Sequence, residues 1–163
     1  MPIFVHIADA RDSAAIRRSG LTVPKARWRS GNHGVFAMPV IDDFMITHQW
    51  VRELARRGHR SAVGIYFRVP DDEPVLAGRF NEAKSRIAAT EAAARLRADR
   101  ILGYEVIIPR SIKPGEIHAI RTVPPIGWRF APEAKGAAPR CVCDWCTGGK
   151  IKGKRLRDRF AAS

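Results

Sequence analysis

The sequence has few cysteines and no long apolar segment. Its three cysteines all lie between Cys141 and Cys146, so they cannot form a disulfide framework across the chain, and a reducing cytoplasm is the simpler location. No stretch approaches the ~20 apolar residues that a membrane-spanning helix needs. The first residues also lack the basic region and apolar run of a secretory signal. We therefore expect a cytoplasmic protein without a membrane span.

Acidic residues are scarce relative to basic ones. The chain has 29 Lys and Arg residues against 16 Asp and Glu residues, which gives a net charge of +13 and a pI of about 10.8. A surplus of this size favours association with a polyanion such as nucleic acid, because Lys and Arg neutralise phosphates and release counterions. The alternative is a solvated basic surface with no polymeric partner.

Hydrophobic residues make up 45% of the chain, which is enough for one main core. Short apolar runs predict strands over residues 3–7, 34–38, 62–69, 103–109 and 116–123. Apolar spacing and alanine content predict helices over residues 14–17, 44–55 and 83–100. Strands at both ends of this series and between the helices indicate an α+β fold rather than a doubly wound sheet.

Capping residues support the first two helices. Asp9 or Asp12 is expected to cap the first and Asp42 or Asp43 the second, while Gly20 stops the first. After residue 125 the pattern weakens into a cysteine cluster and a basic tail. We therefore divide the chain into a main domain over residues 1–125 and a C-terminal region over residues 126–163.

Two polar residues lie in apolar runs that predict strands. His6 belongs to the first run, and Glu105 is followed by three aliphatic residues in a later one. Taken singly, such a histidine is more often structural, and such a glutamate more often faces solvent by alternation.

Together, three short segments resemble the DarT-like ADP-ribosyltransferases. The first is His6-Ile7-Ala8 followed by a short helix that ends in Gly20-Leu21, and the second is the run from Tyr104 to Pro109. The third, Gly34-Val35-Phe36-Ala37, resembles the central strand of the wider superfamily. The segments fall between Ile3 and Val123. Ala8 departs from the family because many members carry a hydroxyl residue there, and Phe36 stands where many carry a tyrosine.

The resemblance implies an ADP-ribosyltransferase-like split central β-sheet with flanking helices and NAD as a substrate. In that reading Glu105 stabilises the positive charge that develops on the ribose, and His6 holds a ribose hydroxyl. Ala8 and Phe36 would contact the cofactor, with Phe36 stacking on nicotinamide. An arginine is expected near the pyrophosphate; the candidates by position are Arg17, Arg27 and Arg29.

The resemblance also implies an acceptor. A nucleobase fits the net charge, which predicts a nucleic-acid-modifying enzyme such as a toxin, with an antitoxin-like protein as a further partner. Three alternatives stay open: transfer to a protein, an RNA 2′-phosphotransferase that uses His33 and His48, and a nucleic-acid-binding protein without enzymatic activity.

The C-terminal region adds two further predictions. Thiolates at Cys141, Cys143 and Cys146 could hold zinc with a fourth ligand from His118, His59 or Asp144; redox-active or incidental cysteines are the alternatives. Basic residues outside the strands are expected to contact nucleic acid. They are Arg27, Arg29, Lys150, Lys152, Lys154 and Arg155.

Overall fold

The computed structural model describes residues 1–23, 33–51, 54 and 61–124. All of them lie in the first of the two units into which the chain divides, Met1–Ile126 and Gly127–Ser163. Several residues singled out from the sequence therefore lie outside the described residues. They are Arg27, Arg29, His59, Cys141, Cys143, Asp144, Cys146, Lys150, Lys152, Lys154 and Arg155.

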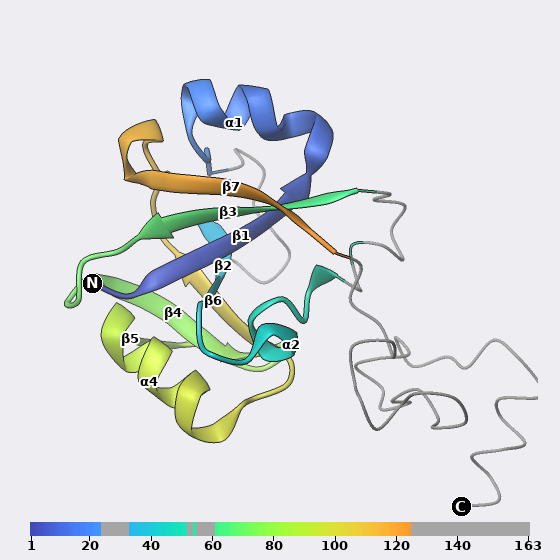
Figure 1. Ribbon diagram of the computed structural model, residues 1–163. Coiled ribbons are helices and arrows are strands. Elements are labelled where there is room, and N and C mark those ends of the chain that lie inside the picture. Colours follow the sequence, from blue (N-terminus) through green and yellow to red (C-terminus); the bar gives the residue numbers. More distant parts are fainter. Residues whose placement is uncertain (24–32, 52–53, 55–60, 125–163) are drawn as a thin grey trace, which may run out of the picture. The chain divides into compact units, whose positions relative to one another are not determined.

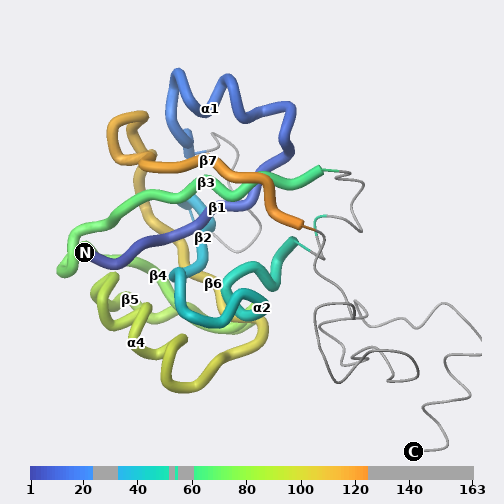
Figure 2. The backbone as a smooth tube through the Cα atoms, viewed as in Figure 1, coloured from blue at the N-terminus to red at the C-terminus, as the bar shows by residue number. Residues whose placement is uncertain are grey.

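The first unit is built on a seven-stranded sheet in which all neighbouring strands are antiparallel. The spatial order is β5-β4-β6-β2-β1-β3-β7. The strands are β1 (Ile3–Asp9), β2 (Val35–Pro39), β3 (Ala62–Arg68), β4 (Pro74–Arg79), β5 (Ser85–Ala88), β6 (Tyr104–Ile108) and β7 (Ile117–Val123). Strands β4 and β5 lie at one end of the sheet and β3 and β7 at the other (Figure 2).

The helices are short and lie at both ends of the sheet. The α-helices are α1 (Ser13–Ser19), α2 (Phe44–Thr47) and α4 (Ala89–Asp99), and the 3₁₀ turns are η1 (Ala10–Asp12) and η2 (Pro114–Glu116). Helix α1 lies beside β7 and α4 lies beside β5 (Figure 1). The α+β class predicted from the sequence is confirmed.

Local sequence explains where α1 and α2 begin and end. Asp43 accepts a hydrogen bond from the backbone N–H of Ile46 at 3.0 Å, as expected for a helix cap. Asp9 caps the 3₁₀ turn η1 by accepting from Arg11 N at 2.9 Å. Asp12 occupies the cap position of α1 without a side-chain hydrogen bond. Gly20 ends α1 with φ of 78°.

The prediction of one helix over residues 83–100 was wrong at its start. Ser85–Ala88 forms the edge strand β5, which pairs with β4 from Pro74↔Ala88 to Ala77↔Ser85. The whole of β4 was missed. Good helix formers in this segment favour a helix locally, but pairing with an exposed strand edge supplies backbone hydrogen bonds that outweigh the local preference.

The second helix is also shorter than predicted. Helix α2 ends at Thr47, and His48, its C-cap, leaves the helical conformation with φ of −107° and ψ of 20°. The backbone N–H groups of Gln49 and Val51 then donate to carbonyls three residues back, Ile46 at 3.5 Å and His48 at 3.0 Å. A turn follows, and helical geometry recurs at Val51 and Leu54.

Small residues allow α4 to pack closely on the sheet. Ala89, Ala92 and Leu96 are fully buried and belong to the main core with Val75 and Tyr104. The Tyr104 hydroxyl reaches the carbonyl of Ala92 at 3.3 Å. The alanines thus bring the helix backbone within reach of a side chain on β6.

Substituting Gly20 by alanine is expected to destabilise the fold by about 3 kcal/mol or more. A Cβ at Gly20 would lie 2.0 Å from the backbone oxygen of Ile112, which itself pairs with Leu21 in a two-sided backbone bridge. Neither backbone segment can move without losing that bridge. Urea unfolding measures the change. Gly115→Ala is the control because a Cβ there meets nothing within 4 Å; equal effects of the two substitutions would contradict this account.

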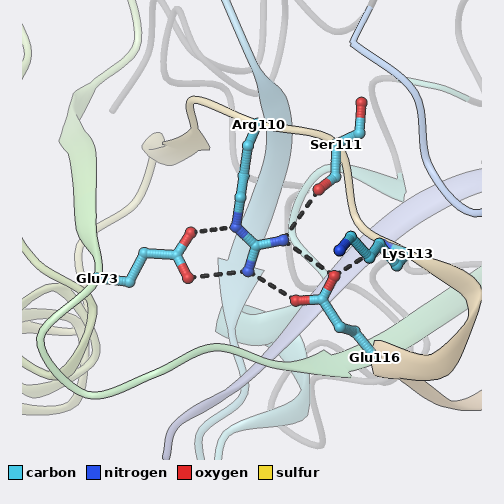
Figure 3. A network of polar contacts seen from close by, with 5 residues as sticks. All are labelled: Glu73, Arg110, Ser111, Lys113 and Glu116. Carbon is cyan, nitrogen blue, oxygen red and sulfur yellow. Dashed lines mark hydrogen bonds and ion pairs between the residues drawn. The ribbon is translucent and has the colours of Figure 1, made fainter.

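Arg110 joins two loops of the fold (Figure 3). Its guanidinium forms paired hydrogen bonds with Glu73 at 2.6 and 2.8 Å, and with Glu116 at 2.6 and 2.9 Å. Glu116 also accepts from the backbone N–H of Lys113 at 2.7 Å. Partial burial opposes the charged form of Glu116, but the bonds from Arg110 and Lys113 outweigh it and lower the pKa of this carboxyl.

Replacing Arg110 by lysine is expected to cost about 1–2 kcal/mol at pH 7, because an ammonium cannot reproduce two bidentate contacts and the site is partly solvated. Since the pKa of Glu116 is lowered in the fold, its stabilisation is present above the ordinary value of 4.5 and is lost as the pH falls below it. Urea unfolding at neutral and acidic pH should show that the difference in free energy of unfolding between the wild type and Arg110→Lys becomes smaller at acidic pH. Arg95→Lys, in an exposed pair with Glu91, is expected to stay within ~0.5 kcal/mol.

Candidate functional site

The sheet opens between β1 and β2. β1 pairs with β3 over seven residue pairs, from Ile3↔Arg68 to Asp9↔Ala62. With β2 it pairs only at Phe4↔Pro39 and Val5↔Met38. Beyond Val5 the two strands are held instead by the His6 side chain, whose Nδ1 lies 2.7 Å from the carbonyl oxygen of Phe36.

A cavity of about 250 Å³ lies at this opening. Three consecutive residues of β1 line it, and three consecutive residues of β2 as well, whereas one face of a closed sheet offers only every second residue. The cavity therefore reaches the strand edges. Among the described residues its lining is mainly apolar: Val5, His6, Ile7, Phe36, Ala37, Met38, Trp50, Leu54, Phe80, Glu105 and Val106.

His6, Phe36 and Glu105, singled out from the sequence, thus line one cavity. Alternation alone would not bring His6 and Glu105 together. In the register of β1, β2 and β6, His6 lies on the same sheet face as Ala37, whereas Glu105 lies on the opposite face. At the gap between β1 and β2 the cavity extends past the strand edges, so that side chains from both faces line it.

His6 is held as a neutral acceptor. The carbonyl oxygen of Phe36 can only accept, so Nδ1 of His6 carries the proton and Nε2 is left as an acceptor. Burial lowers the pKa of His6, and the hydrogen bond to Phe36 opposes this only in part. Within the described residues Nε2 has no hydrogen-bond partner. The ring can therefore accept a hydrogen bond from a hydroxyl group in the cavity.

Glu105 is paired with a buried lysine that sequence reasoning missed. Its Oε2 lies 3.0 Å from Nζ of Lys84, and the two side chains are only 13% and 4% exposed. Nζ also donates to the backbone oxygens of Arg79 and Glu82, so its three protons are all engaged. Burial raises the pKa of Glu105 and Lys84 partly offsets the rise.

Glycine at position 78 leaves room for the side chain of Lys84. Gly78 lies opposite Glu105 in the β4–β6 register. A Cβ on Gly78 would lie 3.0 Å from Cδ of Lys84. The aliphatic stem of the lysine therefore crosses β4 over the glycine to reach the carboxylate. No sequence signal joins residues 84 and 105, because the contact depends on the β4–β6 pairing.

Two aromatic residues form a wall of the cavity that was not predicted as part of a site. Trp50 and Phe80 meet edge to face, with ring centroids 5.8 Å apart. The indole N–H of Trp50 donates to the backbone oxygen of Tyr104 at 2.9 Å, which fixes the ring. Phe80 is 41% exposed, which is unusual for a large apolar side chain. Such exposure indicates a binding site, and it can be seen only in the structure.

Of the other predicted residues, those that the structure describes do not line this cavity. Ala8 lies on β1 opposite Val63, and Arg17 lies on α1 beside a separate small hollow that His118 also lines. His48 is buried with both ring nitrogens engaged, Nδ1 with the carbonyl of Phe44 at 3.0 Å and Nε2 with the Tyr66 hydroxyl at 2.8 Å.

In the described ranges, no group of three or more His, Cys, Asp or Glu residues is arranged to hold a metal ion. The helices of the same ranges include none with the length and apolarity that crossing a bilayer demands. Comparison with known proteins adds no further information: no family model, curated protein or solved structure matches the chain significantly.

Proposed function

We propose that the protein is an NAD-dependent ADP-ribosyltransferase whose reaction takes place in the Glu105 cavity. The observation that carries the proposal is that a carboxylate and a neutral imidazole acceptor line one apolar cavity at a gap in the sheet. The two residues belong to two of the three segments that resemble DarT-like enzymes. An ADP-ribosyltransferase-like split sheet is part of the proposal, and the gap between β1 and β2 supports it.

The size of the cavity fits one end of the dinucleotide. At about 250 Å³ it is slightly smaller than typical ligand pockets of ~300–1,000 Å³. We place the nicotinamide and its ribose inside, with the remainder of NAD outside the cavity. The aromatic lining, Phe36 together with Trp50 and Phe80, suits a planar ring.

The chemistry needs a negative charge in an apolar setting. When the bond between ribose C1′ and the nicotinamide nitrogen breaks, the electron pair leaves with nicotinamide and positive charge grows on the sugar. The Glu105 carboxylate stabilises that charge, and low local polarity strengthens the effect. Nε2 of His6 accepts a hydrogen bond from a ribose hydroxyl and orients the sugar. The acceptor then bonds to C1′ and its proton passes to Glu105.

Lys84 keeps the carboxylate ionised. Burial by itself would favour the protonated form, which cannot stabilise a cation. The ammonium group restrains the rise in the pKa of Glu105 and holds only Oε2. Oε1, which bonds to no other described residue, is then the oxygen that faces the sugar.

We further propose nucleic acid as the acceptor, because the net charge of +13 suits a polyanion. The two ring nitrogens of His48 are both engaged within the fold, which weighs against the 2′-phosphotransferase alternative that would use it. Zinc at the three cysteines stays a separate prediction.

The direct test is incubation of the full chain with NAD labelled in the adenosine portion, together with single-stranded DNA, RNA or a protein extract. Transfer of label to the nucleic acid, with release of nicotinamide, is expected. Transfer of label to protein alone would show that the acceptor is a protein, and it would still support the proposed ADP-ribosyl transfer. Neither transfer nor nicotinamide release with any acceptor would contradict the proposed function and favour a binding protein without catalysis.

A further inference from the structure

A basic cluster with an aromatic centre lies on β3 and β7. Tyr66 is at its middle: the Arg121 guanidinium carbon lies 5.8 Å from the centre of its ring, and the ring of His118 lies 6.4 Å away. Arg68 is two residues along β3 and therefore on the same face. Arg68, His118 and Arg121 are all exposed. We call these four residues the β3–β7 patch.

The two arginines of the patch have no acidic partner among the described residues: neither Arg68 nor Arg121 forms an ion pair there. Burial lowers the pKa of His118, and the charges of Arg68 and Arg121 lower it further. Like charges gathered without counterions destabilise a surface slightly unless an external anion completes it.

The fold holds the centre of the patch in place. Burial lowers the pKa of His48 and favours its neutral form, although the hydrogen bond to Phe44 opposes this in part. In the neutral ring Nδ1 carries the proton, because it donates to the Phe44 carbonyl, and Nε2 accepts the hydroxyl proton of Tyr66. The Tyr66 ring leans over Gly64, where a Cβ would lie 2.9 Å from Cε2. The ring that underlies Arg121 is thus fixed before any ligand binds.

The strand register places the patch on the same sheet face as Glu105. Tyr66 is paired with Val5, and Val5 with Met38. The pairing Ala37↔Val106 makes Glu105 the next neighbour of Met38 across β2 and β6. Three strand spacings of ~4.8 Å therefore separate Glu105 from Tyr66, about 14 Å along the sheet. Val5 and Met38, which lie between them, are only 1% and 2% exposed, so a nucleic-acid strand would pass over the side chains that cover these two residues. A few extended nucleotides cover the distance.

We propose that the β3–β7 patch binds the phosphate backbone of a single-stranded nucleic acid, a few nucleotides from the base that enters the Glu105 cavity. The choice of a nucleic-acid strand follows from charge and from position. Two arginines without an ion pair among the described residues, Arg68 and Arg121, lie on neighbouring strands and suit successive phosphates. A base must also be unpaired to reach a cavity. The inference rests on the proposed function for the choice of nucleic acid as the polymer. The place where the polymer binds is inferred from the patch residues alone.

The test compares two charge-matched double variants of the full chain. Arg68→Gln/Arg121→Gln alters the patch. Arg86→Gln/Arg97→Gln removes the same charge from exposed positions on β5 and α4, at the opposite end of the sheet. Binding of a short fluorescein-labelled single-stranded oligonucleotide is followed by anisotropy between about 50 and 200 mM salt, without NAD.

The patch variant is expected to bind about tenfold more weakly at the low-salt end and to lose about 1.4 from the slope of log affinity against log salt, since each single-strand phosphate contact contributes ~0.7. The control should keep the wild-type slope. If the patch variant keeps the affinity and slope of the control, the strand binds elsewhere on the chain and the proposal is overturned. It is also overturned if the wild-type chain binds no oligonucleotide.

Binding and catalysis can fail separately. A chain that shows the patch-dependent slope but releases no nicotinamide contradicts the proposed reaction and leaves the patch intact. A chain that cleaves NAD with an unchanged slope in the patch variant contradicts the patch alone. Thermal unfolding of both double variants checks that the fold is kept.

Discussion

Replacing Glu105 by glutamine is expected to slow nicotinamide release from NAD by about 10²–10³-fold, the range found when one preorganised electrostatic group is removed from an active site. Glutamine keeps the shape of the side chain but carries no charge to offset the cation that grows on the ribose. The effect should fall on the rate constant rather than on the affinity for NAD, because the charge develops only in the transition state.

The measurement is the rate of nicotinamide release at saturating and subsaturating NAD. Glu82→Gln is the matched control: it is the same chemical change at an exposed position, three residues after the end of β4. It should leave the rate within a factor of about two, as expected for a surface change of small energetic effect. A Glu105→Gln variant as active as the wild type would remove Glu105 from the reaction.

The second large effect is expected at Lys84. Lys84→Met removes the only ion-pair partner of Glu105 that the described residues provide and leaves a buried carboxylate unpaired. Breaking a buried pair in this way typically costs 3–5 kcal/mol, and residual exposure of Glu105 places the expectation near the lower end, about 3 kcal/mol at pH 7. Urea unfolding measures it.

The loss should depend on pH in a defined direction. The pKa of Glu105 is already raised by burial, and removal of Lys84 raises it further, because only the two effects that lower it are lost. A carboxyl with a raised pKa binds a proton more tightly in the fold than when unfolded. The variant is therefore expected to gain stability, relative to the wild type, as the pH falls towards the ordinary carboxyl value of 4.5.

Two further variants separate the role of Lys84 from simple packing. In the double variant Lys84→Met/Glu105→Gln the buried charge is absent, so part of the lost stability should return. Lys84→Arg should retain an ionised Glu105 and an acid limb of the pH–rate profile close to that of the wild type, whereas Lys84→Met shifts that limb to higher pH. A loss of stability in Lys84→Met that is the same at every pH, and is not relieved by Glu105→Gln, would contradict the ion-pair account.

The fold could be predicted in part from local patterns. Strands β1, β2, β3, β6 and β7 are apolar runs bounded by glycine, proline or charged residues, and each lies within one or two residues of its predicted position. Asp43 caps the start of α2 and Gly20 terminates α1, as their residue types predict. These features depend on interactions between residues close in sequence, which is why the pattern contains them.

Strand β5 could not be predicted in this way. Ser85–Ala88 has no strand signal of its own, and the alanine-rich sequence that follows extends the helical pattern backwards over it. Its conformation comes from backbone pairing with β4, a strand that was itself missed. A segment whose structure depends on a partner cannot be assigned from its own composition.

The candidate site, too, could be predicted only in part from the sequence. The sequence by itself singled out His6, Phe36 and Glu105 and predicted a basic surplus that suits a polyanion. The tertiary structure decided that these three line one cavity, because β1 and β2 part after Val5. It also decided that Lys84 pairs with Glu105 and that Arg121 lies over Tyr66. Residue types are fixed by the sequence, but a contact across strands depends on register and strand order, which arise only when the whole sheet assembles.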